Sequence, residues 1–80
     1  MKAIVRIRRR ESIADPEGST IRRALGDLGF TDVQAVRVNR TIELDLQGLD
    51  REEAISQARE MCDRLLVNPV MEDFDIEIVT

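Results

Sequence analysis

Alternation of apolar and polar residues predicts four strands, at residues 2–8, 33–38, 41–47 and 74–78. In the first of them, Ala3, Val5 and Ile7 fall on one side, and mainly basic residues fall on the other. In the last, Phe74 begins a run in which apolar residues alternate with acidic ones. The first and last strands are therefore expected to bury one face and to expose the other to water.

Apolar residues spaced three and four apart predict two helices. The first is expected to begin at a cap formed by Ser19 or Thr20 and to end at Gly29. The second is expected to begin at Asp50, which forms a capping box with the glutamate three residues later. It ends at Asn68 because the proline that follows cannot continue a helix.

The resulting order, βαββαβ, predicts a single α+β domain that covers residues 1–80. We expect a two-layer sandwich in which a four-stranded antiparallel sheet carries both helices on one face. Asn39 and Arg40 are expected to form the hairpin turn between the second and third strands. In the strand order 4-1-3-2 that is usual for this topology, the basic first strand lies between two acidic strands. We therefore expect a lattice of ion pairs on the helix-free face.

The composition removes most routes to catalysis by this chain. Its 80 residues include no histidine, no tryptophan, no tyrosine and one cysteine. Without histidine, the serines and Cys62 lack their usual activating base, and the histidine-containing zinc sites cannot form. Cys62 lies on the apolar stripe of the second helix, so we expect a buried thiol rather than a nucleophile. We expect no catalytic residue, no bound metal and no bound cofactor in this chain.

The expected location is the cytoplasm. No apolar run is long enough for a transmembrane helix or for the core of a signal peptide. One cysteine cannot form an internal disulfide, which favours a reducing compartment.

The basic start of the chain raises the possibility of nucleic-acid binding. The first ten residues carry five basic and no acidic residues, whereas the other seventy carry seven basic and sixteen acidic residues. RNA-binding sheets of this topology stack bases on aromatic side chains, but the only aromatic residues here are Phe30, near a helix end, and Phe74, on the apolar face. We therefore expect no nucleic acid to bind. Arg9 and Arg10, beyond the predicted lattice, are expected to be free to contact a partner protein.

Two turns marked by proline stand beside the predicted helices. Asp15-Pro16-Glu17-Gly18 precedes the first helix, and Asn68-Pro69 follows the second. Proline restricts its own φ angle and the conformation of the residue before it, so each turn fixes the local direction of the chain. A tight turn and a partner-contacting loop are both open interpretations of the first motif, since loops on rigid scaffolds often carry function.

Three motifs stand in order along the chain: Asp15-Pro16-x-Gly18, Leu25-Gly26-x-Leu28-Gly29-Phe30, and Cys62-x-x-Leu65-Leu66-x-Asn68-Pro69-Val70 before a strand with Glu72 and Phe74. Taken together, they resemble the PurS family, the small subunit of phosphoribosylformylglycinamidine synthase. The resemblance runs nearly end to end, and two positions depart from it: Asn39-Arg40 stands where the family often has a Gly-Lys type of turn, and the start is unusually rich in arginine.

The resemblance implies an accessory subunit of an ATP-dependent carbon–nitrogen ligase in de novo purine biosynthesis. In that family, a synthetase subunit uses ATP and Mg to activate formylglycinamide ribonucleotide (FGAR), and a glutaminase subunit releases ammonia from glutamine. The products are formylglycinamidine ribonucleotide (FGAM) and glutamate. The small subunit, typically a dimer, bridges the two and supports ammonia transfer. The implied partners are a second copy of this chain, the synthetase and the glutaminase, without nucleic acid or membrane.

Exposed turns and the predicted sheet edge are expected to make these contacts. The candidates for contact with the other subunits are Arg9, Arg10, Asp15, Pro16, Gly18, Ser19, Leu65, Leu66, Asn68 and Pro69. The candidates for pairing with a second copy along an edge strand are Val33, Ala35, Val36 and Val38.

Other classes of function stay open at this point. A free-standing regulatory module of ferredoxin-like topology, binding a small ligand at a dimer interface, would have the same order of elements. The chain shows no ligand-specific motif that favours this alternative. An RNA-binding domain comes third, and a self-sufficient enzyme comes last because no pair of nucleophile and base is available.

Overall fold

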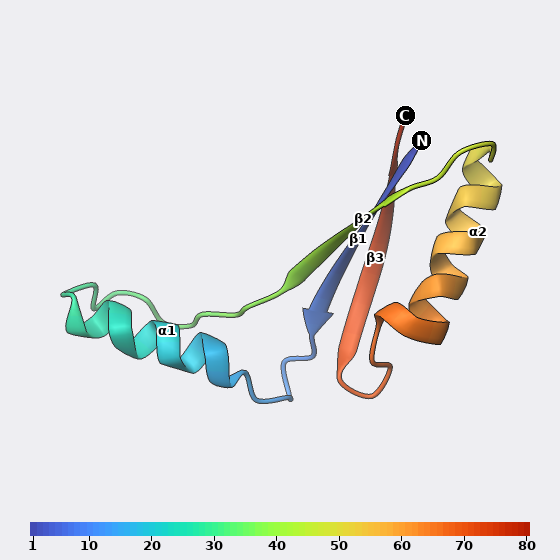
Figure 1. Ribbon diagram of the computed structural model, residues 1–80. Coiled ribbons are helices and arrows are strands. Elements are labelled where there is room, and N and C mark those ends of the chain that lie inside the picture. The colour runs from blue at the N-terminus through green and yellow to red at the C-terminus, as the bar shows by residue number, and fades with distance from the viewer.

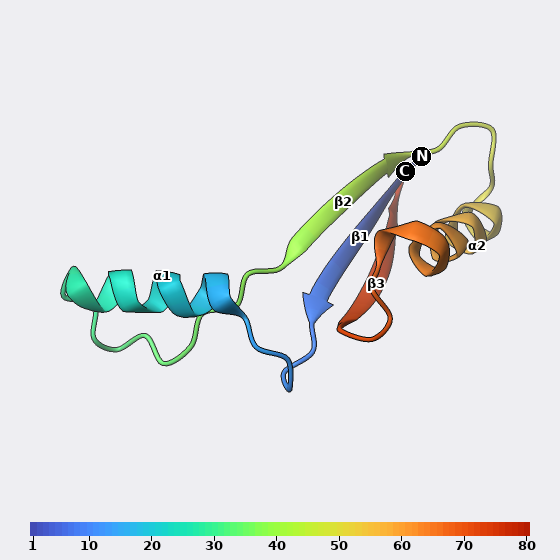
Figure 2. The same cartoon turned by 60° about the horizontal axis from the view of Figure 1, so that its bottom comes forward.

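A computed structural model describes residues 1–80 and contains three strands and two α-helices. Their bounds are β1 (Lys2–Arg9), α1 (Pro16–Asp27), β2 (Arg40–Asp45), α2 (Arg51–Met61) and β3 (Glu72–Val79), with a short π-helix, η1 (Cys62–Leu66), directly after α2. The strands, α2 and η1 form the body of the molecule. In contrast, α1 projects away from this body (Figures 1 and 2).

The sheet has the order β2-β1-β3, and β1 runs antiparallel to both neighbours. Near its centre, Val5 lies opposite Ile42 of β2 and Ile76 of β3. The two ends of the chain lie side by side at one end of the sheet (Figure 1). The predicted positions of the first, third and fourth strands in the sheet are thus confirmed.

The predicted strand at residues 33–38 is wrong, so the sheet has three strands rather than four. This segment runs back beside α1, and part of its backbone is hydrogen-bonded there. The amide of Val38 donates to the Asp15 carboxylate, and the carbonyl oxygen of Val33 accepts from Arg22. Local contacts with the helix and its cap thus take backbone groups that a sheet ladder would need. Asn39-Arg40 forms no hairpin turn, because the chain passes directly into β2.

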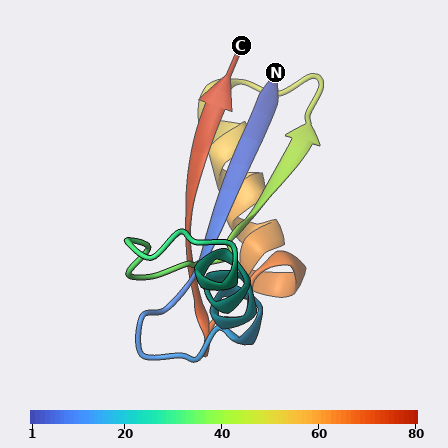
Figure 3. The same cartoon turned by 90° about the vertical axis from the view of Figure 1, so that its left-hand side faces the viewer.

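The expected packing of both helices on one face of the sheet is also wrong. Only α2 packs on this face, against β1 and β3, whereas α1 and the segment after it form an arm, residues 16–39 (Figure 3). The molecule measures 50 × 26 × 14 Å, and its Cα radius of gyration is 16.2 Å. A compact chain of this length has a radius of gyration of about 12 Å. The arm therefore makes the single chain elongated and leaves the inner side of β2 without a helix over it.

Both helices begin at an aspartate cap. α1 begins at Pro16, earlier than predicted, because Asp15 rather than Ser19 is its N-cap and proline suits the first turn of a helix. Asp50 caps α2 as predicted, accepting from the amide of Glu53 at 2.8 Å. Gly29, with a φ of 98°, follows the end of α1. In length and apolarity, neither helix meets the requirement for crossing a membrane.

The core is small, with 10 of 80 residues buried. Burial of Ala3, Val5 and Ile7 confirms the predicted inward side of the first strand. Cys62 is fully buried as expected, and this burial raises the pKa of its thiol. The core consists of two clusters, one of Ala3, Ala54, Ala58 and Ile78 and one of Val5, Ile7, Cys62 and Val67.

The helix-free face carries the ion-pair lattice that the sequence predicts. Arg6 of β1 lies 2.7 Å from Glu77 and 3.7 Å from Asp75 on β3, and Lys2 lies 3.3 Å from Glu43 on β2. The contact with Glu77 is the main cause that raises the pKa of Arg6. The basic central strand therefore has acidic partners on both sides, which favours this register over a shifted one.

Ala58→Leu is expected to destabilise the fold because Ala58 is fully buried where α2 meets the sheet. The added carbons have no space, and the free energy of unfolding should fall by about 1–3 kcal/mol. Urea denaturation followed by circular dichroism measures this change. The control is Gln57→Leu at an exposed position of the same helix, with an expected change below about 0.5 kcal/mol. Wild-type stability of Ala58→Leu would contradict the close approach of α2 to the sheet.

Candidate functional site

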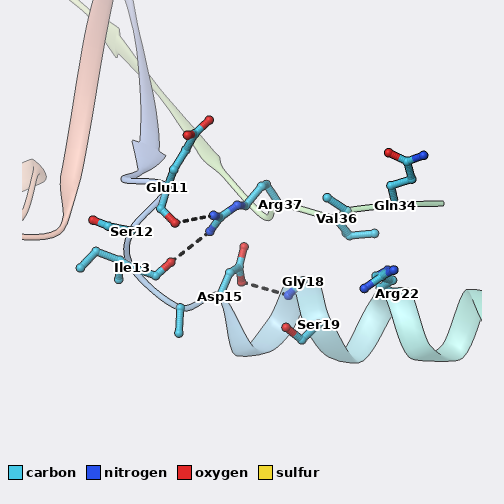
Figure 4. Close-up of a pocket in the computed structure, with 12 residues that line it drawn as sticks. Glu11, Ser12, Ile13, Asp15, Gly18, Ser19, Arg22, Gln34, Val36 and Arg37 are labelled. Atoms are coloured by element: carbon cyan, nitrogen blue, oxygen red, sulfur yellow. Dashed lines mark hydrogen bonds between the residues drawn. The ribbon is translucent and has the colours of Figure 1, made fainter.

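The junction between the body and the arm is organised around the carboxylate of Asp15 (Figure 4). One of its oxygens accepts from the amide of Gly18 at 2.9 Å, and the other accepts from the amide of Val38 at 2.8 Å. Asp15 is only 8% exposed. Its side chain thus connects the start of α1 to the segment that returns to β2, and it fixes the direction of both.

Gly18 allows the returning segment to come close to α1. A Cβ atom at this position would lie 2.2 Å from the backbone oxygen of Val36, far inside contact distance. The glycine is therefore needed because it has no side chain. Together, Asp15 and Gly18 give the Asp15-Pro16-Glu17-Gly18 motif an internal role as a joint. A partner contact by Asp15, Pro16, Gly18 or Ser19 stays a prediction.

Two arginines hold the loop between β1 and α1. Arg37 donates to the backbone oxygens of Ile13 at 3.0 Å and Glu11 at 2.8 Å (Figure 4). Arg9 donates to the backbone oxygen of Ala14 at 2.7 Å. The loop is thus fixed both from the sheet and from the returning segment of the arm.

The pKa of Asp15 lies below its ordinary value, mainly because the amides of Val38 and Gly18 donate to its charged form. The positive charges of Arg9, 4.0 Å away, and Arg37 lower it further. A carboxyl group with a lowered pKa stabilises the fold above its unfolded pKa of about 3.9, and this contribution is lost as the pH falls through the lower folded value. The joint should therefore be intact at neutral pH and weaken in acid.

A shallow hollow of about 420 Å³ lies between α1 and the returning segment, beside the joint (Figure 4). Three of its charged groups already have partners within the chain: Asp15 accepts from two amides, Arg37 donates to two backbone oxygens, and Arg22 donates to Val33 O at 3.1 Å. Ser19 lines the hollow in a chain without histidine. The hollow therefore cannot contain the usual catalytic pair of serine and histidine. Across residues 1–80, no three potential metal ligands gather in one place.

The joint at Asp15 is one fixed surface, by which we mean a surface segment whose backbone is held by side-chain hydrogen bonds. A second fixed surface lies after α2, where the helix widens into η1. The amide of Val67 donates to the carbonyl oxygen of Cys62 at 3.1 Å, the hydrogen bond that defines a π-helical turn. Leu66 is half-buried and packs against the core, whereas Leu65 is 83% exposed. The two consecutive leucines thus have different surroundings, the core for Leu66 and water for Leu65.

Asn68 fixes the chain that follows η1. Its side-chain oxygen accepts from the amide of Val70 at 3.0 Å, and its backbone oxygen accepts from the amides of Met71 at 3.2 Å and Glu72 at 2.8 Å. In return, the Glu72 carboxylate accepts from the amide of Asn68 at 2.9 Å. This last bond is the main cause that lowers the pKa of Glu72. We refer to residues 65–70 as the Leu65–Val70 turn.

Two further arginines hold this turn. Arg10 donates to the backbone oxygen of Pro69 at 2.8 Å, and Arg40, at the start of β2, donates to the backbone oxygen of Leu66 at 2.7 Å. Arg40 also lies 3.0 Å from Glu72. The turn is therefore attached to the strands on which the body is built.

Arg9 and Arg10 are not free, contrary to expectation. Arg9 binds the loop before α1, and Arg10 contacts Asp73 at 3.3 Å as well as Pro69. Their role in contacting a partner stays a prediction.

The candidates for pairing with a second copy lie on the returning segment of the arm rather than on a sheet edge. Val33, Val36 and Val38 are half-buried, and Ala35 is exposed. Their pairing with a second copy stays a prediction.

Sequence reasoning missed Arg37 and Arg40, which hold the two fixed surfaces. Their backbone partners lie 24 to 26 residues away in the chain. No local pattern marks such contacts, because an exposed arginine looks the same in the sequence whether it meets water or a distant carbonyl group.

Comparison with known proteins gives one consistent family. The model of the PurS family, described as phosphoribosylformylglycinamidine (FGAM) synthase, matches residues 2–80. PurS of Methanocaldococcus jannaschii is 39% identical over 77 residues, which cover 96% of this chain and 93% of the relative. PurS of Archaeoglobus fulgidus is 41% identical over 76 residues, covering 95% of each.

Solved structures give the same result. The crystal structure of M. jannaschii PurS matches with a TM-score of 0.85 and 38% identity, and it covers 95% of this chain and 92% of the other. A chain in the structure of PurLQS from Thermotoga maritima matches with a TM-score of 0.85 and 30% identity, covering 95% and 93%. The arrangement found here is therefore close to that of experimentally determined chains.

Asp15→Asn is expected to lower the melting temperature by roughly 5 °C at pH 7, because the amide nitrogen must face one of the two backbone N–H groups. The difference from wild type should begin to shrink as the pH falls below about 4, because the unfolded chain then takes up a proton, and it should be lost as the pH falls through the lower pKa of the folded carboxyl group. Thermal melts followed by circular dichroism at several pH values check both points. Asp32→Asn, at an exposed position of the arm, is the matched control. Identical melting of Asp15→Asn and wild type at pH 7 would rule out the joint.

Proposed function

Because the chain belongs to the PurS family, whose model matches residues 2–80, we propose that it is a non-catalytic scaffold within phosphoribosylformylglycinamidine synthase. Membership of the family makes it a subunit of this ligase complex in purine biosynthesis. The observation that carries the scaffold role is that both fixed surfaces use their charged groups to hold the chain's own backbone. The carboxylate of Asp15 and the guanidinium groups of Arg37 and Arg40 all serve this purpose.

The scaffold holds the glutaminase and synthetase subunits together and supports the passage of ammonia between them. Hydrolysis of glutamine needs an activated nucleophile, and a chain without histidine lacks the usual base. Activation of the second substrate with ATP and Mg is assigned to the synthetase. Ammonia that escapes into water is diluted and protonated, so the position of one active site relative to the other affects the yield of the reaction. A rigid protein of fixed shape contributes to this geometry without any reactive group.

We further propose that the chain works as a homodimer joined through the arm. Three of its large apolar side chains lie open on the arm: Ile21 is 38% exposed, Leu28 74% and Phe30 60%. On the sheet, α2 packs on β1 and β3, and Ile42 and Leu44 on the inner side of β2 are only half-buried. The arm of a second copy would cover this side of β2, and the exchange would be reciprocal because both copies carry both surfaces.

Leu28→Glu and Ile21→Glu, each made alone, are expected to convert the dimer to monomers, because a charged group would enter the apolar contact. Light scattering coupled to size-exclusion chromatography measures the mass. Ser56→Glu adds the same charge at an exposed position on α2 and should leave the dimer intact. Either a monomeric wild type or dimers in both arm variants would refute association through the arm.

Leaving this chain out of a reconstituted complex is expected to lower glutamine-dependent formation of FGAM by an order of magnitude or more. Turnover with ammonium chloride, which bypasses the glutaminase, should fall far less. The assay combines purified synthetase and glutaminase subunits with and without the chain and measures FGAM under both conditions. A second arm incubates the chain alone with glutamine, ATP, Mg and FGAR, where no product is expected.

Two results would count against the scaffold role. One is unchanged glutamine-dependent turnover and unchanged co-elution of the other subunits when the chain is absent. The other is FGAM or glutamate formed by the isolated chain.

A further inference from the structure

A hollow of about 460 Å³ lies where the end of α2 meets the start of β3 (Figure 1). Its lining residues come from α2, η1, β3 and the adjoining loops, and none of them belongs to β2. The hollow is therefore separate from the side of the sheet that the arm of a second copy would cover. Its size is within the range of sites that hold small molecules.

Two charged side chains in this hollow have no partner of opposite charge. Arg10 pairs with Asp73 at 3.3 Å, and the Glu72 carboxylate accepts from the amide of Asn68. By contrast, Arg59 and Asp63 form neither a hydrogen bond nor an ion pair within the chain, although both line the hollow. One free cation and one free anion are thus available to a ligand.

The ring of Phe74 explains why these two side chains do not pair. Arg59 and Asp63 lie one turn of helix apart, a spacing at which opposite charges commonly meet. The guanidinium of Arg59 lies instead over the ring of Phe74, with its central carbon 5.9 Å from the ring centroid. This position holds the guanidinium group at the hollow and leaves the carboxylate of Asp63 unpaired.

The floor of the hollow is apolar. Cys62 is fully buried, Val67 is 8% exposed, and Phe74 is half-buried. Burial is the main cause that raises the pKa of the Cys62 thiol; the charge of Asp63 raises it further, and the charge of Arg59 lowers it. Both unpaired groups therefore stand close to the same apolar floor.

The balance of charge restricts the class of ligand. Two arginines and three carboxylates line the hollow, so a phosphate or another dianion would be repelled on balance. A metal ion is not favoured, since no three potential metal ligands gather anywhere in residues 1–80. The free groups match a small molecule with one positive charge, one negative charge and an apolar part.

We propose that this hollow binds a free α-amino acid with an apolar side chain. Asp63 accepts from the α-ammonium group, Arg59 donates to the α-carboxylate, and the side chain of the ligand lies on Val67 and Phe74. Because the two charged groups of an α-amino acid are attached to one carbon atom, residues one turn of helix apart can reach both. This site does not depend on the scaffold role.

The test titrates the full chain with L-leucine, L-methionine and L-valine, each alone, by calorimetry. At least one should bind and, near saturation, raise the melting temperature by several degrees, because it binds only the folded chain. For each amino acid, the amine that lacks the carboxylate and the acid that lacks the amino group should bind about tenfold or more weakly. L-Glutamate should also bind more weakly, since its second carboxylate would face three carboxylates.

Arg59→Gln and Asp63→Asn, made singly, should each weaken the binding of the amino acid by about tenfold or more. Their melting temperatures without ligand should match wild type, because both side chains are exposed. Arg51→Gln, at an exposed position of the same helix, and Asp32→Asn, on the arm, are the matched controls and should bind like wild type.

Three results would overturn this site. The first is that none of the three amino acids binds, and the second is that an amino acid binds no better than its analogue without one charged group. The third is wild-type affinity in either Arg59→Gln or Asp63→Asn, which would place the ligand elsewhere. All of these measurements use the chain alone, so they leave the scaffold role to its own assay.

Discussion

The two hydrogen bonds of the Asp15 carboxylate, one to the amide of Gly18 and one to the amide of Val38, fix where α1 lies. In a βαβ-containing sandwich, a helix after the first strand commonly folds back over the sheet. Here the chain must bring residue 38 to residue 15, so the helix and the returning segment leave the sheet and come back to it at the same place. The position of the arm, the uncovered side of β2 and the elongated shape of the chain all follow from this joint.

The molecule combines a small core with strongly fixed loops. With 10 of 80 residues buried, little apolar surface stabilises the single chain, and the largest exposed apolar side chains lie mainly on the arm and in the Leu65–Val70 turn. Both regions are nevertheless held by arginines that donate to backbone oxygens. Such a design suits a subunit whose contribution is shape, since its contact surfaces are in place before the partners bind.

Much of the body could be predicted from the sequence because its signals are local and periodic. Alternation in β1 and β3, the Asp50 cap, the burial of Cys62 and the ion pairs of the basic strand all appear as expected. The fourth strand could not be excluded, because Val33 and Val38 satisfy a strand pattern while their backbone groups bind α1 and its cap. The roles of Arg37 and Arg40 were hidden for the same reason: their partners are distant backbone oxygens that carry no signal in the sequence.

The middle strand of the sheet comes first in the chain, and one of its two neighbours comes last. During synthesis on the ribosome, β1 therefore emerges long before β3 exists. Until residues 72–79 leave the exit tunnel, β1 keeps one edge open, and only β2 is available to pair with it. Folding of the body must therefore wait for residues 72–79, and until then the nascent polypeptide carries a strand whose apolar face chaperones or premature association with another nascent copy would have to cover.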